Sequence, residues 1–141
     1  MIANLILRAE FEILIQAYSF TSKRIAGALA AVRRRGITVR VILDGSNRHD
    51  PFSVAGILAR AGVTVLSDDQ VAIAHNKIIV VDRAAVLTGS ANFTPSAQHR
   101  NAENVLLVHG DRKLAAAYVG NWEIRAALAS PLEAGGGAPG R

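Results

Sequence analysis

Short apolar runs typical of β-strands alternate with amphipathic segments typical of α-helices along most of this chain. Strands are predicted at 13–17, 38–43, 63–66 and 104–108, and two more between 75 and 92. Helices are predicted at 4–12, from Thr21 or Ser22 to about Arg35, from Pro51 to about Ala61, and from Asp111 to about Ala129. Elements in this order pack as layers, so we expect an α/β domain with a mixed β-sheet flanked by helices on both faces.

Composition sets broad limits on what such a domain can do. The chain has 141 residues, 50% of them hydrophobic, which is enough for one domain with a substantial core. It has no cysteine, so disulfides and cysteine-ligated metal sites are excluded. The net charge of +5 fits a polyanionic partner, nucleic acid or an anionic membrane surface, although ordinary solubility charge explains a value of this size more simply.

Apolar runs, aromatic content and the C-terminal composition give further expectations about membrane spans, base stacking and the bounds of the domain. No apolar run approaches the length of a membrane span, and only 5% of the residues are aromatic, so base-stacking platforms are not expected. Residues 1–129 are expected to form the domain. Residues 130–141 contain PLEAGGGAPGR and are expected to be a disordered tail.

The polar residues with the clearest chemical meaning lie between His75 and Asn92. His75-x-Lys77-x4-Asp82 surrounds a β-branched run that predicts a strand, and alternation along a strand places His75 and Lys77 on one face, roughly 6–7 Å apart. An ammonium beside an imidazole that can attack or move a proton suits a phosphate group. Ser90 and Asn92 follow a second apolar run and can add neutral hydrogen bonds to the same anion.

This pattern, H-x-K-x4-D followed by Gly89-Ser90-x-Asn92, resembles the signature of the phospholipase D superfamily. The segments 16–21 (QAYSFT), 35–37 (RGI) and 101–104 (NAEN) are also similar to its small single-motif bacterial endonucleases. The resemblance extends from about Glu12 to Arg125. It implies the fold of one half of a phospholipase D-like α-β-α sandwich.

The resemblance also implies an activity and a role for each motif residue. The activity is metal-independent phosphodiester cleavage of nucleic acid, DNA or RNA, without a cofactor. His75 would be the nucleophile that forms a phosphohistidine, Lys77 would hold the phosphate oxygens, and Glu103 would accept a hydrogen bond from His75. Asp82 belongs to the catalytic motif, but strand alternation places it on the opposite face, so anchoring of the following turn is its expected role.

One motif supplies only one histidine, whereas the chemistry needs a second group to protonate the leaving oxygen. A twofold homodimer with both His75 side chains facing the axis would provide it. Two rivals remain: a phospholipid phosphodiesterase of phospholipase D or cardiolipin type, and a non-catalytic basic dimer that binds nucleic acid. No amphipathic membrane helix or aromatic anchor is evident in favour of the lipid substrate, and stable membrane insertion is not expected.

Outside the motif, the start of the chain and the other histidines carry less information. The related nucleases have a strand before the first helix, whereas this chain starts almost at that helix. Either the start is misassigned, the chain is a fragment, or the sheet is one strand short. Localisation is therefore open: cytoplasmic for the chain as given, periplasmic or secreted if a leader is missing. Of the other histidines, His99, next to Arg100, lies nearest the motif and could touch substrate backbone.

Overall fold

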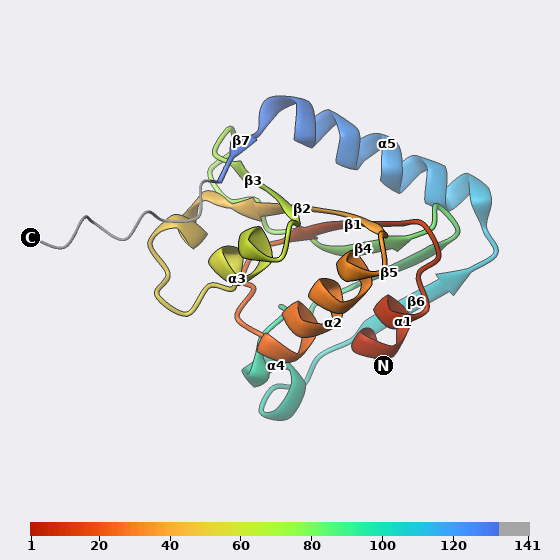
Figure 1. Cartoon of the computed structure of the whole chain (residues 1–141), viewed down its shortest axis with the longest axis horizontal. Helices are drawn as coiled ribbons and strands as arrows, with labels where there is room; N and C mark the ends of the chain where they lie inside the picture. The colour runs from red at the N-terminus through yellow and green to blue at the C-terminus, as the bar shows by residue number, and fades with distance from the viewer. Residues whose placement is uncertain (133–141) are drawn as a thin grey trace, which may run out of the picture.

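A seven-stranded mixed β-sheet forms the middle layer of the computed structural model, which describes residues 1–132 (Figure 1). The strands are β1 (Glu12–Ala17), β2 (Thr38–Asp44), β3 (Thr64–Asp68), β4 (Lys77–Val81), β5 (Ala85–Gly89), β6 (Val105–His109) and β7 (Ser130–Pro131). Their order across the sheet is β6-β5-β4-β1-β2-β3-β7. β1, β2 and β3 run parallel, and every other neighbouring pair is antiparallel.

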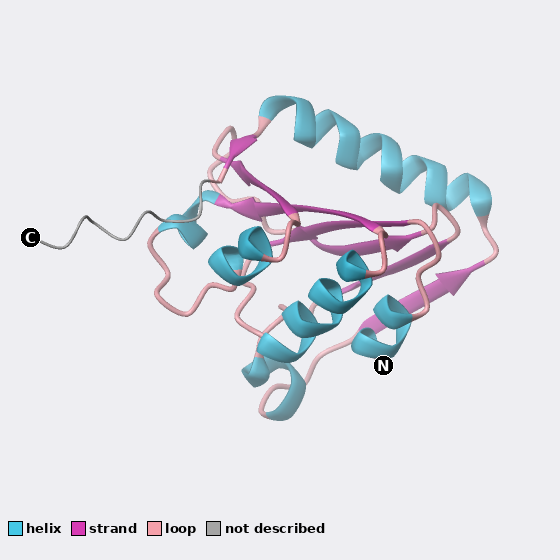
Figure 2. Cartoon of the chain, in the orientation of Figure 1, coloured by secondary structure: helices cyan, strands magenta, loops and turns pink. Residues whose placement is uncertain are grey.

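Helices cover both faces of the sheet, which confirms the predicted fold class (Figure 2). They are α1 (Ile2–Leu7), α2 (Lys23–Arg34), α3 (Ala55–Arg60), α4 (Pro95–His99) and α5 (Arg112–Leu128), with a 3₁₀ turn at Gly45–Arg48. α5 packs on one face, where Trp122 is fully buried and its Nε1 donates to the Ile15 carbonyl at 2.9 Å. α1, α2 and α3 pack on the other face (Figure 1).

The caps of the two longest helices agree with the sequence prediction. The Ser22 hydroxyl accepts a hydrogen bond from the Ile25 N–H at 3.2 Å and starts α2, and the Asp111 carboxylate starts α5 in the same way through the Leu114 N–H. After α2, Gly36 has φ +88°, a conformation that lets the chain turn directly into β2.

Two predicted helices are shorter than expected because side chains bind the backbone at their ends. The first helix ends at Leu7 rather than Glu12, since the N–H groups of Glu10, Phe11 and Glu12 donate to Asp82 instead of continuing the helix. The helix predicted from Pro51 begins only at Ala55, because the Asp50 carboxylate accepts the Phe52 N–H and holds a turn there.

The first two residues assigned to the predicted tail pair with the sheet. Ser130 and Pro131 pair antiparallel with β3, and the Leu132 N–H donates to the Val65 carbonyl at 2.9 Å. Leu132 is buried in the core on the α1–α3 side of the sheet, and this apolar contact explains why the chain turns back to the sheet edge. The rest of the predicted tail lies outside the described residues. Within residues 1–132, none of the helices combines the length and apolarity needed to cross a membrane.

Candidate active site

The predicted site residues gather at one edge of the sheet, where four segments meet. In the strand register, Lys77 at the start of β4 is paired with Ala17 at the end of β1, and Gly89 at the end of β5 is paired with Val105 at the start of β6. The residues before or after these ends therefore lie close together. These residues are Tyr18, His75, Ser90 and Glu103.

His75 is not on a strand, contrary to the prediction, because β4 begins only at Lys77. The Ala74 N–H donates to the Asp44 carboxylate at 2.7 Å, which draws this segment toward the end of β2. The His75 ring is exposed and stands edge-on to the Tyr18 ring, with 4.8 Å between the ring centroids. An exposed imidazole held by one aromatic contact is accessible to a substrate.

Lys77 is the buried cation of the site, with 7% of the residue exposed. Its Nζ donates to the backbone carbonyl of His75 at 2.7 Å and lies 5.5 Å from the centre of the Tyr18 ring. Burial lowers the pKa of Lys77, and the negative charge of Glu103 acts in the opposite direction. The two motif residues are thus neighbours, although the bond between them runs through the backbone of His75.

Glu103 is bound by Ser90 and Asn101 rather than by His75. The Ser90 hydroxyl donates to Oε2 of Glu103, and Nδ2 of Asn101 donates to Oε1 at 3.2 Å. These two bonds, Ser90 first, lower the pKa of the Glu103 carboxyl, and Lys77 lowers it further. Among the hydrogen bonds of residues 1–132 there is none between His75 and Glu103, so the predicted contact is not present in this structure.

Ser90 also joins two backbone segments, which explains the glycine before it. Its Oγ accepts the Asn104 N–H at 3.0 Å, and its own N–H donates to the Asn104 carbonyl at 2.9 Å. A Cβ on Gly89 would overlap that same carbonyl, so glycine at this position permits the close approach of the two backbone segments.

Asn92 has an unused polar atom in the site. The side chain is half-buried, and its Oδ1 is buried without a hydrogen-bond partner among the described residues. Together with Glu103 it lines a hollow of about 310 Å³. A buried acceptor without a partner is costly, so Asn92 is available to bind a ligand.

Asp82 lies at the opposite end of β4 from Lys77. Its carboxylate accepts the N–H groups of Glu10, Phe11 and Glu12 at 2.8–2.9 Å. Asp82 thus fixes the entry into β1, while its own φ of +53° forms the turn from β4 to β5. This position fits the anchoring role expected from strand alternation and leaves Asp82 apart from His75.

Replacing Asp82 with alanine should therefore lower stability more than chemistry. Losing a carboxylate that accepts three backbone N–H groups should reduce the free energy of unfolding by about 2 kcal/mol, measured by urea denaturation. Asp50→Ala, which removes an acceptor for one N–H group, should have a smaller effect. An Asp82→Ala protein with an unchanged urea midpoint and no turnover would instead give Asp82 a catalytic role.

The sequence also matches a known protein family. The family described as "Cardiolipin synthase, PLD-like domain" matches residues 2–123. The chain belongs to the phospholipase D superfamily. The resemblance inferred from the motif is therefore confirmed, and it extends over most of the described residues.

Relatives with similar sequences carry two different names. "Phospholipase D" of Rickettsia felis is 48% identical over 121 residues, which are 86% of this chain and 60% of that protein. "Mitochondrial cardiolipin hydrolase" of Xenopus tropicalis is 37% identical over 119 residues, 84% of this chain and 56% of that protein. This chain thus spans about 60% of the length of the Rickettsia felis relative.

Solved structures of the superfamily share the fold. The phospholipase D family member Nuc from Salmonella typhimurium superposes with a TM-score of 0.90 at 32% identity, covering 93% of this chain and 88% of Nuc. NucT from Helicobacter pylori superposes with a TM-score of 0.84 at 26% identity, over 93% and 88% of the two chains.

Sequence reasoning missed the part that Tyr18 plays in this phospholipase D-type site. The sequence pattern includes Tyr18 only as part of the segment 16–21, whereas its ring contacts His75 and lies near the Lys77 ammonium. The available signal was its place directly after β1, since antiparallel pairing brings the end of β1 beside the start of β4. In residues 1–132, no cluster of three or more His, Asp or Glu side chains is arranged to hold a metal ion.

Proposed function

We propose that this chain is a metal-independent phosphodiesterase that cleaves nucleic acid, with DNA as the favoured substrate, through a phosphohistidine on His75. The observation that carries the proposal is the pairing of an exposed imidazole with a buried ammonium at one sheet edge. An accessible nucleophile beside a desolvated cation is what attack on a phosphodiester requires.

In the first step, a ring nitrogen of His75 forms a bond to phosphorus and the bond from phosphorus to the leaving oxygen breaks. Lys77 moves its Nζ from the His75 carbonyl to a non-bridging oxygen and stabilises the negative charge that develops there. Burial lowers the pKa of Lys77, and the negative charge of Glu103 acts in the opposite direction. Glu103 therefore favours the charged form of Lys77 that this role needs. Asn92 can donate to the same phosphate through its Nδ2, whereas the Ser90 hydroxyl can do so only by giving up its bond to Glu103.

In the second step, water attacks the phosphohistidine and releases the other product, restoring His75. A proton must first reach the leaving oxygen and later leave the water, on the side of phosphorus opposite His75. We assign this role to His75 of a second copy, in a twofold homodimer. The exposure of the His75 ring is compatible with a partner approaching from solvent.

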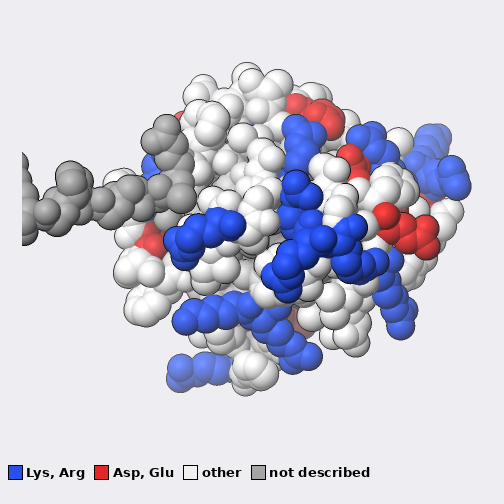
Figure 3. Space-filling model, viewed as in Figure 1, with Lys and Arg blue, Asp and Glu red and all other residues white. Residues whose placement is uncertain are grey.

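The substrate assignment rests on charge. Figure 3 shows Lys and Arg spread over the face that α2 and α3 form, with the acidic patches at its margins. Among the described residues, Lys23, Arg24, Arg34 and Arg60 make no side-chain hydrogen bond or ion pair, so their charges are available to a polyanion.

A phospholipid is the second candidate substrate, because apolar side chains are exposed on two loops. Ile73, two residues before His75, is 56% exposed, and Phe52, on the loop before α3, is 77% exposed. Such side chains are suited to contact acyl chains. The names of the Rickettsia and Xenopus relatives agree with this candidate, and we rank it below nucleic acid on the charge of the α2 face.

The proposal predicts that cleavage survives chelation. Nitrogen, hydroxyl and amide groups fill every assigned role at phosphorus, so a plasmid-nicking assay should give the same rate in millimolar EDTA as without it. Anionic liposomes assayed in parallel test the lipid candidate. Loss of nicking in EDTA with recovery in Mg²⁺ would contradict the mechanism, and release of lipid headgroups without any nicking would contradict the substrate.

A further inference from the structure

Two hollows lie side by side next to the candidate active site, each of about 310 Å³. The first contains Asn92 and Glu103 of the site. The second lies between the start of α2 and α4 and is lined by Lys23 and His99. Arg24 and Gln98 line both hollows, so the two are neighbours, and we call the pair the track.

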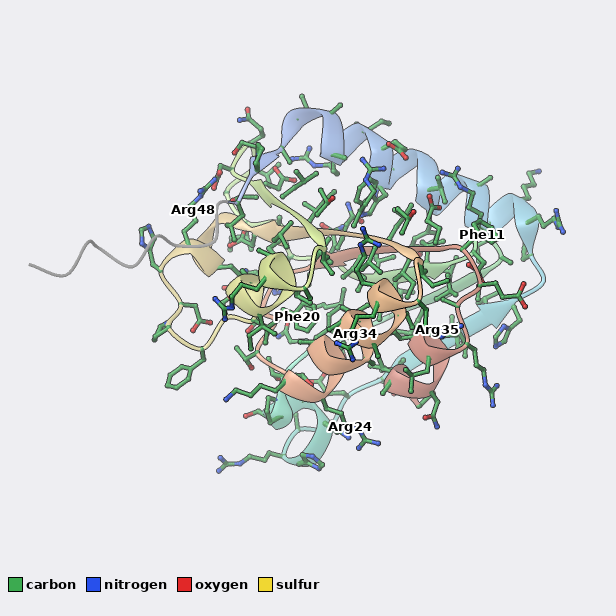
Figure 4. The ribbon with its side chains drawn as sticks, in the orientation of Figure 1. Phe11, Phe20, Arg24, Arg34, Arg35 and Arg48 are labelled. Atoms are coloured by element: carbon green, nitrogen blue, oxygen red, sulfur yellow. The ribbon has the colours of Figure 1, made fainter. Side chains whose placement is uncertain are left out.

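The outer hollow is lined by the basic side chains of Lys23, Arg24 and His99. Within the described part of the chain, the side chains of Lys23, Arg24 and His99 form no hydrogen bond or ion pair, whereas Arg48, Arg83 and Arg125 are each paired with a carboxylate. Figure 4 shows Arg24 extending beside α4. Both Lys23 and Arg24 begin α2, whose twelve-residue dipole adds to the attraction for an anion.

The inner hollow has a different character. Part of its wall is apolar, formed by residues such as Ile25, Ala97 and Val105, while Gln98 and Asn101 bring amide groups to it. A nucleobase has this combination of apolar faces and a polar edge. An acyl chain would leave the Gln98 amide without a partner, and it would meet charged groups in the outer hollow.

We propose that this track binds the nucleotide next to the scissile phosphate, with its base in the inner hollow and its outer phosphate on Lys23, Arg24 and His99. The inference rests on the proposed nuclease function and adds a subsite to it. It also gives a role to His99, which the sequence placed near the motif. Arg24 carries the largest share, since it lines both hollows and can hold a phosphate with two parallel hydrogen bonds.

The test compares two substrates of the intact protein: bis(p-nitrophenyl) phosphate, which fills only the catalytic centre, and a labelled single-stranded oligonucleotide. Arg24→Gln should lower kcat/KM on the oligonucleotide roughly tenfold more than on the small diester, because one charged phosphate contact is lost. The salt dependence of oligonucleotide binding should also become shallower by about 0.7 in log–log slope. Lys23→Gln should act in the same direction.

Two matched controls remove the same charge elsewhere. Arg112→Gln and Lys113→Gln each change the exposed start of α5, on the other face of the sheet. Both should leave the oligonucleotide rate within about twofold of the wild type.

Several outcomes would contradict the proposal that the track binds this nucleotide. These are an equal loss on both substrates, no loss on the oligonucleotide, or a loss no larger than that of Arg112→Gln. Weaker binding of Arg24→Gln to anionic phosphatidylglycerol vesicles, with normal oligonucleotide cleavage, would show that the track binds a lipid surface instead of a nucleotide. If the wild type hydrolyses the small diester and no oligonucleotide, the proposed substrate fails; if it cleaves both and Arg24→Gln does so equally well, only the track fails.

Discussion

Replacing His75 with alanine should reduce phosphodiester cleavage to background, a loss of at least roughly 10⁴-fold in kcat. The substitution removes the nucleophile and, in a symmetric dimer, also the group that protonates the leaving oxygen. Turnover of a plasmid and of bis(p-nitrophenyl) phosphate should be lost together, because both substrates need the same attack on phosphorus.

The fold should survive this change, so the loss reports on chemistry. The His75 side chain is exposed and its ring contact is with Tyr18, while the bond that Lys77 makes to His75 uses the backbone carbonyl and remains in the alanine variant. His109→Ala is a matched control, since it removes an exposed imidazole at the end of β6. That variant should keep the wild-type rate and a similar unfolding midpoint.

Trapping the intermediate gives a second, independent readout. Acid-labile, base-stable label from a ³²P-substrate should appear on the wild type after rapid alkaline quenching and be missing from His75→Ala. A His75→Ala protein that still turns over, or that still becomes labelled, would move the nucleophile to another residue.

The elements and their order could be predicted because local rules determine them. The β-branched run 78–81 is suited to a buried strand, and Ser22 and Asp111 cap helices through neighbours three residues away. The site was found through the spacing of His75, Lys77, Ser90 and Asn92. Those four residues lie at the ends of two adjacent strands, which pairing brings together.

What the sequence could not predict depends on contacts between distant segments. The break of the strand before Lys77 comes from Asp44, thirty residues upstream of Ala74. The early end of α1 comes from Asp82, about seventy residues away from the N–H groups it accepts. The bonding of Glu103 by Ser90 rather than by His75 depends on how β5 and β6 pair. Local sequence propensity does not show which distant residues form these contacts.

Activity should require two copies of His75, one from each subunit of a dimer. A single imidazole that attacks phosphorus lies on one side of it, while the leaving oxygen departs on the other, so a second imidazole is needed there. Dilution below the dissociation constant of the dimer should therefore lower the specific activity. Sedimentation of the same samples should show the dimer dissociating over the same concentrations.

Mixing subunits separates this arrangement from independent sites. When equal amounts of wild-type and His75→Ala chains are allowed to exchange, about one quarter of the dimers contain two wild-type subunits. The mixture should therefore have about one quarter of the activity of the same total amount of wild-type protein. If each subunit worked alone, about one half would remain. A tandem fusion with one mutant half gives the sharper result, because every molecule then carries one His75 and should be inactive. Near half-maximal activity from that fusion would remove the need for a second imidazole and with it the dimeric site.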